Sequence, residues 1–145
     1  MEKQNYKNHV RFYPPHHFVF YPILLILLGF SIYYISKYEE QSLIWTFVAL
    51  AFFMIGYVAF MLRQHYALNN QNRIIRLELR FRYYVLTGQR LETYEDTLSE
   101  GQLFALRFAS DAELPGLVQR AVQENITPDE IKKSIKNWLP DHMRV

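Results

Sequence analysis

Two long stretches of the sequence carry no charged side chain, and they constrain the fold more than any other feature. Residues 18–36 and residues 43–62 contain no Asp, Glu, Lys or Arg and consist mainly of large apolar residues. A helix needs about 20 mostly apolar residues to cross the roughly 30 Å hydrocarbon core of a bilayer. The sequence therefore predicts two transmembrane helices, and the short loop at residues 37–42 makes them antiparallel neighbours.

Basic residues beside the spans predict the orientation of this hairpin. Short cytoplasmic segments next to a span are enriched in Lys and Arg, whereas external loops are not. The only basic residue of the loop is Lys37. Basic residues flank the hairpin at both ends: Lys3, Lys7 and Arg11 before the first span, and Arg63, Arg73 and Arg76 after the second. We therefore expect an inner-membrane protein with both termini in the cytoplasm.

A cleaved signal peptide is the alternative explanation of the first apolar stretch, because basic residues precede it. The stretch is longer than the apolar region of a signal peptide, no small-residue cleavage site precedes Lys37, and a second span follows at once. The sequence therefore favours a retained hairpin. Neither span contains Asp, Glu, Lys, Arg or His, which disfavours a channel or a transporter.

Small residues within the spans would allow the two helices to approach each other closely. They are Gly29 in the first span and Ala49, Gly56 and Ala59 in the second. Ordinary membrane-helix composition explains them equally well.

Residues 63–87 follow the second span and are ambiguous between strand and helix. Alternate residues are apolar, as in a strand: Leu77, Leu79, Phe81, Tyr83 and Val85. A helical repeat is also present: Ile74, Leu77, Phe81 and Tyr84. We predict a helix, because no Pro or Gly separates this segment from the span and Gly88 is a suitable stop. Whether it continues the span as one rod or breaks near Asn69, Asn70 and Asn72 stays open.

The C-terminal residues predict three short helices. Each expected start has Ser or Thr followed three residues later by Gln or Glu, which is the pattern of a capping box: Ser99 with Gln102, Ser110 with Glu113, and Thr127 with Glu130. Apolar stripes at helical spacing follow the second and third starts: Leu114, Leu117, Val118, Ala121 and Val122, then Ile131, Ile135, Trp138 and Leu139.

The predicted fold is therefore all-α, with a transmembrane hairpin, a membrane-proximal helix and a small cytoplasmic three-helix module. An N-terminal segment at residues 1–17 precedes the hairpin. Residues 63–97 hold the membrane-proximal helix and an acidic linker, and residues 98–145 form the module.

Four segments carry a resemblance to a known family. They are QNYKNH near the N-terminus, RIIRLE at residues 73–78, LRFASDAELPGLV at residues 106–118 and the tail EIKKSIKNWLPDHMRV. Together they resemble a bacterial family of small two-span membrane proteins of unknown function. The resemblance implies a bacterial inner-membrane location and implies no activity, cofactor or site.

Three histidines are the candidates for a cofactor site. His16 and His17 precede the first span and His65 follows the second, so an antiparallel hairpin places all three near the same membrane face. Imidazole groups there suit a metal, a haem or a quinone headgroup. Polar groups at an interface are the simpler interpretation, because no carboxylate is spaced with them as a further ligand, and we predict no bound cofactor or metal.

No other pattern indicates catalysis. The sequence has no cysteine and lacks the common phosphate-loop, nucleophile-elbow and zinc-helix motifs. Arg107 interrupts an apolar helix, and we predict a structural ion pair with Asp111 four residues on, with Glu113 and Asp141 as other candidate partners. We therefore expect a protein that is not an enzyme.

The expected function is that of an accessory, assembly or scaffold subunit that binds a protein partner or a second copy of itself. Residues 63–90 are rich in arginine and residues 91–131 are acidic, which suggests charge pairing within or between chains and no nucleic-acid binding. A His-based redox protein and a sensor of anionic lipids are the alternatives. The expected partner or lipid contacts are Arg73, Arg76, Arg80, Arg82, Leu114, Leu117, Val118, Lys132, Lys133, Lys136 and Trp138.

Overall fold

The computed structural model describes residues 4–10 and 12–141. They form two compact units: residues 12–69, called the hairpin unit, and a second unit, called the module, which combines the N-terminal segment with residues from 70 onward. No β-strand occurs among the described residues, where pairing is limited to one isolated bridge between Ala109 and Trp138. The predicted all-helical fold is therefore confirmed for this part of the chain.

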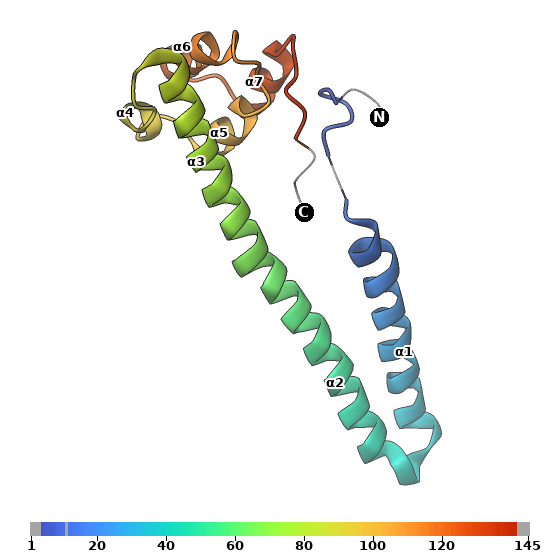
Figure 1. The fold of residues 1–145 in the computed structure, drawn as a ribbon. Helices are drawn as coiled ribbons and strands as arrows, with labels where there is room; N and C mark the ends of the chain where they lie inside the picture. Colours follow the sequence, from blue (N-terminus) through green and yellow to red (C-terminus); the bar gives the residue numbers. More distant parts are fainter. Residues whose placement is uncertain (1–3, 11, 142–145) are drawn as a thin grey trace. The chain divides into compact units, whose positions relative to one another are not determined.

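Two long apolar helices, α1 (Tyr21–Lys37) and α2 (Ser42–Met61), form the hairpin unit. They run side by side in opposite directions (Figure 1), and a single 3₁₀ turn, Glu39–Gln41, connects them. A π-helical segment precedes α1 at Pro15–Phe20, and another follows α2 at Leu62–Ala67.

A glycine of α2 lies at a close contact with α1. A Cβ atom added at Gly56 would lie 2.8 Å from Leu24 Cδ2, so any larger residue would require the Leu24 side chain to move. Ala49 is also buried in the hairpin. The other glycine that the sequence pointed to, Gly29, has no neighbour within 4 Å of such a Cβ and takes no part in this contact.

Helix α3 (Leu68–Thr87) belongs to the module from residue 70 onward. The backbone is helical at every residue from Glu39 to Thr87. The asparagines near residue 70 therefore do not interrupt the helix. The predicted helix, as opposed to a strand, is confirmed. Gly88 follows at φ +69°, a left-handed conformation that glycine adopts without strain and that commonly ends helices.

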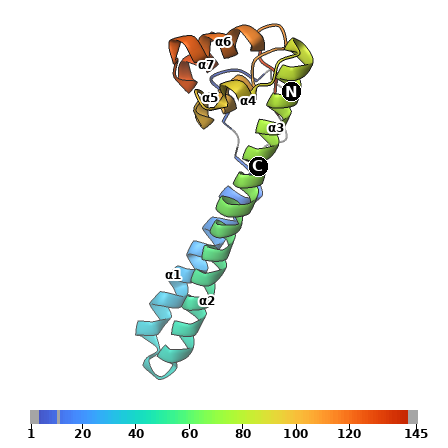
Figure 2. The same cartoon turned by 90° about the vertical axis from the view of Figure 1, so that its left-hand side faces the viewer.

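Four short helices follow: α4 (Glu92–Glu95), α5 (Glu100–Leu106), α6 (Leu114–Glu124) and α7 (Pro128–Ser134). Figure 2 shows them gathered beside α3. Capping boxes begin α5 at Ser99 and α7 at Thr127, as predicted. The third predicted box, at Ser110, is absent, because α6 begins after Glu113 and that carboxylate accepts hydrogen bonds from elsewhere in the module.

The apolar stripe predicted to follow Thr127 was too long. Helix α7 ends at Ser134, and Ile135 is extended, so Trp138 and Leu139 do not continue the helix. They form instead a short connection to the loop after α5, in which the Leu139 N–H donates to the Phe108 carbonyl oxygen at 2.8 Å.

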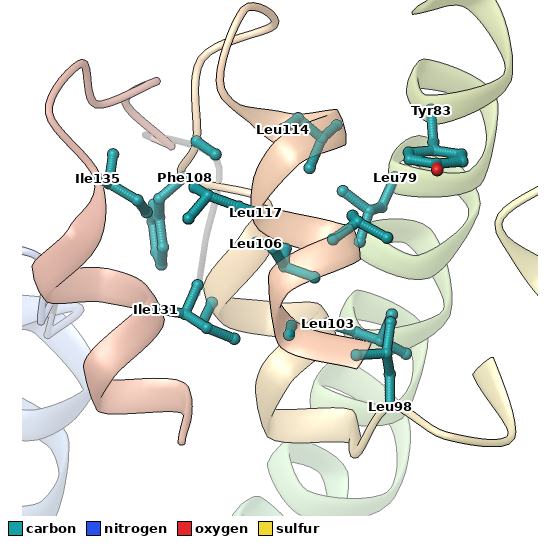
Figure 3. Packing of buried hydrophobic residues seen from close by; sticks show 14 of the residues in the cluster. Leu79, Tyr83, Leu98, Leu103, Leu106, Phe108, Leu114, Leu117, Ile131 and Ile135 are labelled. Atoms are coloured by element: carbon teal, nitrogen blue, oxygen red, sulfur yellow. The ribbon is translucent and has the colours of Figure 1, made fainter. Parts of the chain in front are cut away.

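One apolar core holds the module together, and Figure 3 shows its packing. Leu79 and Tyr83 of α3 are each 1% exposed and point toward the short helices. The short helices and their connections supply the other fully buried large side chains: Leu91, Leu103, Leu106, Phe108, Leu114, Val118 and Ile131. Burial of one such side chain stabilises the fold by about 1.5 to 3 kcal/mol.

The N-terminal segment packs on the rest of the module, which the sequence did not predict. The Tyr6 hydroxyl donates to Asp129 at 2.6 Å, and the Asp141 N–H donates to the Gln4 side-chain oxygen at 2.8 Å. The His9 ring lies 5.9 Å from the Phe108 ring and 5.8 Å from the Trp138 ring, measured between centroids. Residues on both sides of the hairpin thus belong to one folded unit.

Candidate functional site

One side of helix α3 exposes a row of large apolar side chains, which we call the outer face of α3. Its members are Ile74 (56% exposed), Leu77 (65%), Phe81 (70%), Tyr84 (55%) and Val85 (64%). The opposite side of the same helix carries Ile75, Leu79 and Tyr83, which are buried in the core. The module therefore folds around one face of α3 and leaves the other without a partner among the described residues.

The outer face has the spacing of a coiled-coil seam. Ile74, Leu77, Phe81 and Tyr84 occupy positions i, i+3, i+7 and i+10, which are the a and d positions of a heptad repeat. A shallow hollow of about 480 Å³, lined by Leu77, Phe81 and Tyr84 together with polar neighbours, lies along it. Large exposed apolar patches with a polar rim commonly mark sites of interaction with a protein, a membrane or a ligand.

Most arginines of α3 pair with acids of the module itself. Arg76 contacts Glu100 at 3.4 Å, and Arg80 donates two hydrogen bonds to Glu95, of which the Nε bond is 2.7 Å long. Arg82 donates from Nε to Asp111 at 2.5 Å. The basic and acidic blocks of the sequence therefore meet within one chain, and these three arginines are already engaged.

The Arg80–Glu95 pair also shifts the ionisation of both groups. The hydrogen bonds from Arg80 lower the pKa of Glu95 below its ordinary value, and the same bonds raise the pKa of Arg80. Both side chains stay charged near neutral pH, so the pair fastens the middle of α3 to α4.

Arg73 and Glu78 differ from these three arginines. Both are exposed on α3, on the two flanks of the outer face, and neither forms an ion pair with another described residue. Their charges are therefore available to a partner that lies on the outer face.

The apolar residues expected to contact a partner lie in the core. Leu114 and Val118 are fully buried and Leu117 is 9% exposed, so α6 directs this stripe inward. Trp138 is half-buried, with its ring centroid 4.9 Å from that of Phe108.

The three lysines expected at the same surface have different environments. Lys133 forms an ion pair with Asp129 at 2.7 Å, and the Lys132 amine lies 3.3 Å from His9 Nε2. Lys136 is exposed, but its backbone N–H donates to Glu113 at 3.0 Å.

Arg107 forms an ion pair, but its partner is Asp141 and not the predicted Asp111. Its Nε lies 3.4 Å from Asp141 Oδ2, and its guanidinium stacks 4.5 Å from the Phe108 ring centroid. Asp111 pairs with Arg82 instead. Helix α5 ends at Leu106, so the helical spacing between Arg107 and Asp111 does not exist.

Two of the three candidate histidines line a cavity in the hairpin unit. The cavity has a volume of about 380 Å³ and lies between the two π-helical segments. Its lining is Tyr13, His16, His17, Phe20, Ala59, Leu62, Arg63 and Ala67, and His65 is not part of it. His16 Nε2 is buried and has no hydrogen-bond partner among the described residues. Among all the residues that the structure describes, no group of three His, Asp or Glu side chains is arranged to hold a metal ion.

The structure thus defines a helical protein with a long apolar hairpin and a small module that exposes one apolar helix face. The chain belongs to a family of unknown function, DUF6526, whose model matches residues 1–145. No curated protein and no solved structure matches it significantly.

Proposed function

We propose that this chain is a non-catalytic accessory, assembly or scaffold protein of the bacterial inner membrane, anchored by α1 and α2. In this proposal the cytoplasmic module binds a protein partner through the outer face of α3. The observation that carries the proposal is this contiguous apolar face, which the module itself leaves uncovered.

Exposure of the hairpin supports the membrane location. The most apolar 18-residue window of each long helix has only 6% of its residues buried. A core helix of a soluble protein buries its apolar stripe, whereas lipid tails solvate apolar side chains on all sides. The hairpin therefore has the composition and the exposure that a lipid environment accommodates.

The N-terminal segment supports a hairpin with both ends on the same side. Residues before α1 and residues after α2 pack in one module, through Tyr6 with Asp129 and Gln4 with Asp141. A module assembled from both flanks requires both flanks in one compartment. Cleavage after the first span would remove part of this module.

A photo-crosslinking experiment in native membranes tests the docking role. A crosslinking amino acid replaces Phe81 on the outer face or, as the matched control, Gln119, which is exposed on α6. We expect one crosslinked product from position 81 and none from position 119. Equal labelling at both positions, or labelling of lipid alone at position 81, would refute the docking role.

The cavity beside His16 supports a second candidate, a site for a quinone headgroup. An apolar cavity with a few polar groups at its wall is the usual form of a small-molecule site. Arg63 and the orphan His16 Nε2 supply those polar groups. Organic extraction of protein purified in mild detergent tests it: we expect stoichiometric quinone, reduced in Ala59→Phe, and quinone-free protein would exclude it.

Sensing of anionic lipids receives less support. Arg76, Arg80 and Arg82 are paired with carboxylates of the same chain, which reduces the positive charge that a membrane surface would meet. Liposome binding that does not depend on anionic lipid content would exclude this alternative.

A further inference from the structure

We infer that the partner on the outer face of α3 is a second copy of this chain, whose α3 packs in parallel in a short coiled coil. This inference deepens the proposed function and rests on it. Three features of α3 support it: the heptad spacing, the flanking charges, and the separation of this face from the core.

The heptad spacing places the main outer-face residues at contact positions. Ile74 and Phe81 occupy a positions, Leu77 and Tyr84 occupy d positions, and Val85 lies beside them at an e position. In a parallel two-stranded coiled coil each a or d side chain packs beside the same residue of the other chain. The seam extends over residues 74–85, a length of about 18 Å at 1.5 Å per residue.

The core residues of α3 lie outside this seam. Buried Leu79 falls at position f, and buried Ile75 and Tyr83 fall at positions b and c, all on the far side of the helix from a and d. The module can therefore keep its core packing unchanged while the outer face packs on another helix.

The flanking charges are self-complementary only in the parallel orientation. Arg73 occupies a g position and Glu78 the e position of the next heptad, so each Arg73 faces the Glu78 of the other copy. In an antiparallel pair g faces g and e faces e, so arginine would face arginine and Glu78 would face Glu78. The other arginine at a g position, Arg80, is held by Glu95 of its own chain, and the e position it would face is Val85.

Membrane insertion adds a reason for the same orientation. Two copies inserted in one bilayer with the same topology present their α3 helices in the same direction. Confinement to the bilayer also raises the effective concentration of one copy for another. A seam of two heptads, which is marginal in solution, gains stability from this confinement.

Disulfide crosslinking of the full-length protein in liposomes tests the inference directly. The natural chain has no cysteine, so a single introduced cysteine reports one position only. Leu77→Cys and Tyr84→Cys lie in the seam, and Gln119→Cys on the exposed side of α6 is the control. We expect both seam variants to form disulfide-linked dimers, also when excess lipid dilutes the protein in the bilayer. We expect the control variant to form no such dimer.

Charge exchange in the Leu77→Cys background tests the orientation with the same disulfide readout. Arg73→Glu and Glu78→Arg each turn both interchain pairs repulsive, and the loss of two attractive pairs of up to about 1 kcal/mol each weakens dimerisation by up to about 30-fold. The double exchange restores the two attractive pairs, and we expect it to restore crosslinking.

Two outcomes overturn the inference and differ in what they mean for the docking role. Crosslinking between the Ile74→Cys and Tyr84→Cys variants in a mixture, with none within either variant alone, would establish an antiparallel pair. Absence of any seam disulfide, while the photo-crosslinker at position 81 captures another protein in native membranes, would exclude a second copy and retain the docking role.

Discussion

Helix α3 is fastened to the loop after α5 by one guanidinium, that of Arg82. Its Nε donates to Asp111 at 2.5 Å, its Nη1 donates to the Arg107 carbonyl oxygen at 3.2 Å, and its Nη2 donates to the Ala109 carbonyl oxygen. The Arg82 side chain is 19% exposed and that of Asp111 is 67% exposed. The two carbonyl bonds therefore lie in a drier environment than the ion pair.

This geometry sets the cost of Arg82→Met. A hydrogen bond that involves a charged group contributes about 1.5 to 3 kcal/mol, and unpaired buried carbonyls add to the loss. An exposed ion pair contributes about 0 to 1 kcal/mol. With partial compensation by water at the loop, we expect Arg82→Met to lower the free energy of unfolding of the module by about 3 kcal/mol. We expect Asp111→Asn to lower it by less than about 1 kcal/mol.

Tryptophan fluorescence of the full-length protein in detergent measures these costs. Trp138 lies in the module and Trp45 in α2, so a Trp45→Phe background leaves Trp138 as the reporter. For a domain of this size, 1 kcal/mol shifts Tm by about 4 to 8 °C, so Arg82→Met should lower Tm by about 12 to 24 °C. Arg82→Lys should fall close to Arg82→Met, because one ammonium cannot reproduce the forked donors.

Comparison of the variants tests the assignment to the carbonyl bonds. If Asp111→Asn is as destabilising as Arg82→Met, or if high salt removes the difference in stability between the natural protein and the Arg82→Met variant, the ion pair carries the energy. Either result would refute the reasoning.

Three further predictions concern packing, pH and capping. Gly56→Leu forces Leu24 aside, so it should destabilise the hairpin by about 1 to 3 kcal/mol, seen as faster unfolding in SDS, whereas Gly29→Leu should not. Burial opposes ionisation of Glu113, but hydrogen bonds from the Ser110 hydroxyl and the backbone N–H groups of residues 136 and 137 outweigh it and lower its pKa. The resulting stability is present at neutral pH and lost as pH falls through the lowered pKa, so Glu113→Gln should flatten the acid limb of a Tm–pH curve. Ser99→Ala removes a capping box and should cost about 1 kcal/mol, with faster amide exchange in the first turn of α5.

Local signals in the sequence predicted the local structure of the module well. The capping boxes at Ser99 and Thr127 are determined by residues three apart, and both begin helices where expected. In the stripe beginning at Leu114, every member except the half-buried Val122 is buried, as its helical spacing indicates. Such features depend on neighbours in sequence, which are available without knowledge of the fold.

Choices between distant partners were not predictable in the same way. The sequence offers Arg107 several candidate acidic partners. Because α5 ends at Leu106, Arg107 lacks the helical spacing to Asp111 and forms its ion pair with Asp141. Packing of Tyr6 and His9 on the module joins residues separated by the whole hairpin, and no periodic pattern in so short a polar segment reveals it. The sequence placed three histidines at one membrane face, but only His16 and His17 line the cavity.

The ambiguity of residues 63–87 has a physical explanation that involves the outer face of α3. An amphipathic helix with one apolar stripe gives a clear helical period. Helix α3 has two stripes: Ile75, Leu79 and Tyr83 face the core, and Ile74, Leu77, Phe81 and Tyr84 face outward. Between residues 75 and 83 every odd-numbered residue is apolar or aromatic and belongs to one of the two stripes, and every even-numbered residue is Arg or Glu. This alternation produces the strand-like pattern. The strand-like alternation therefore results from two apolar stripes on one helix, of which the module buries one and leaves the other exposed among the described residues.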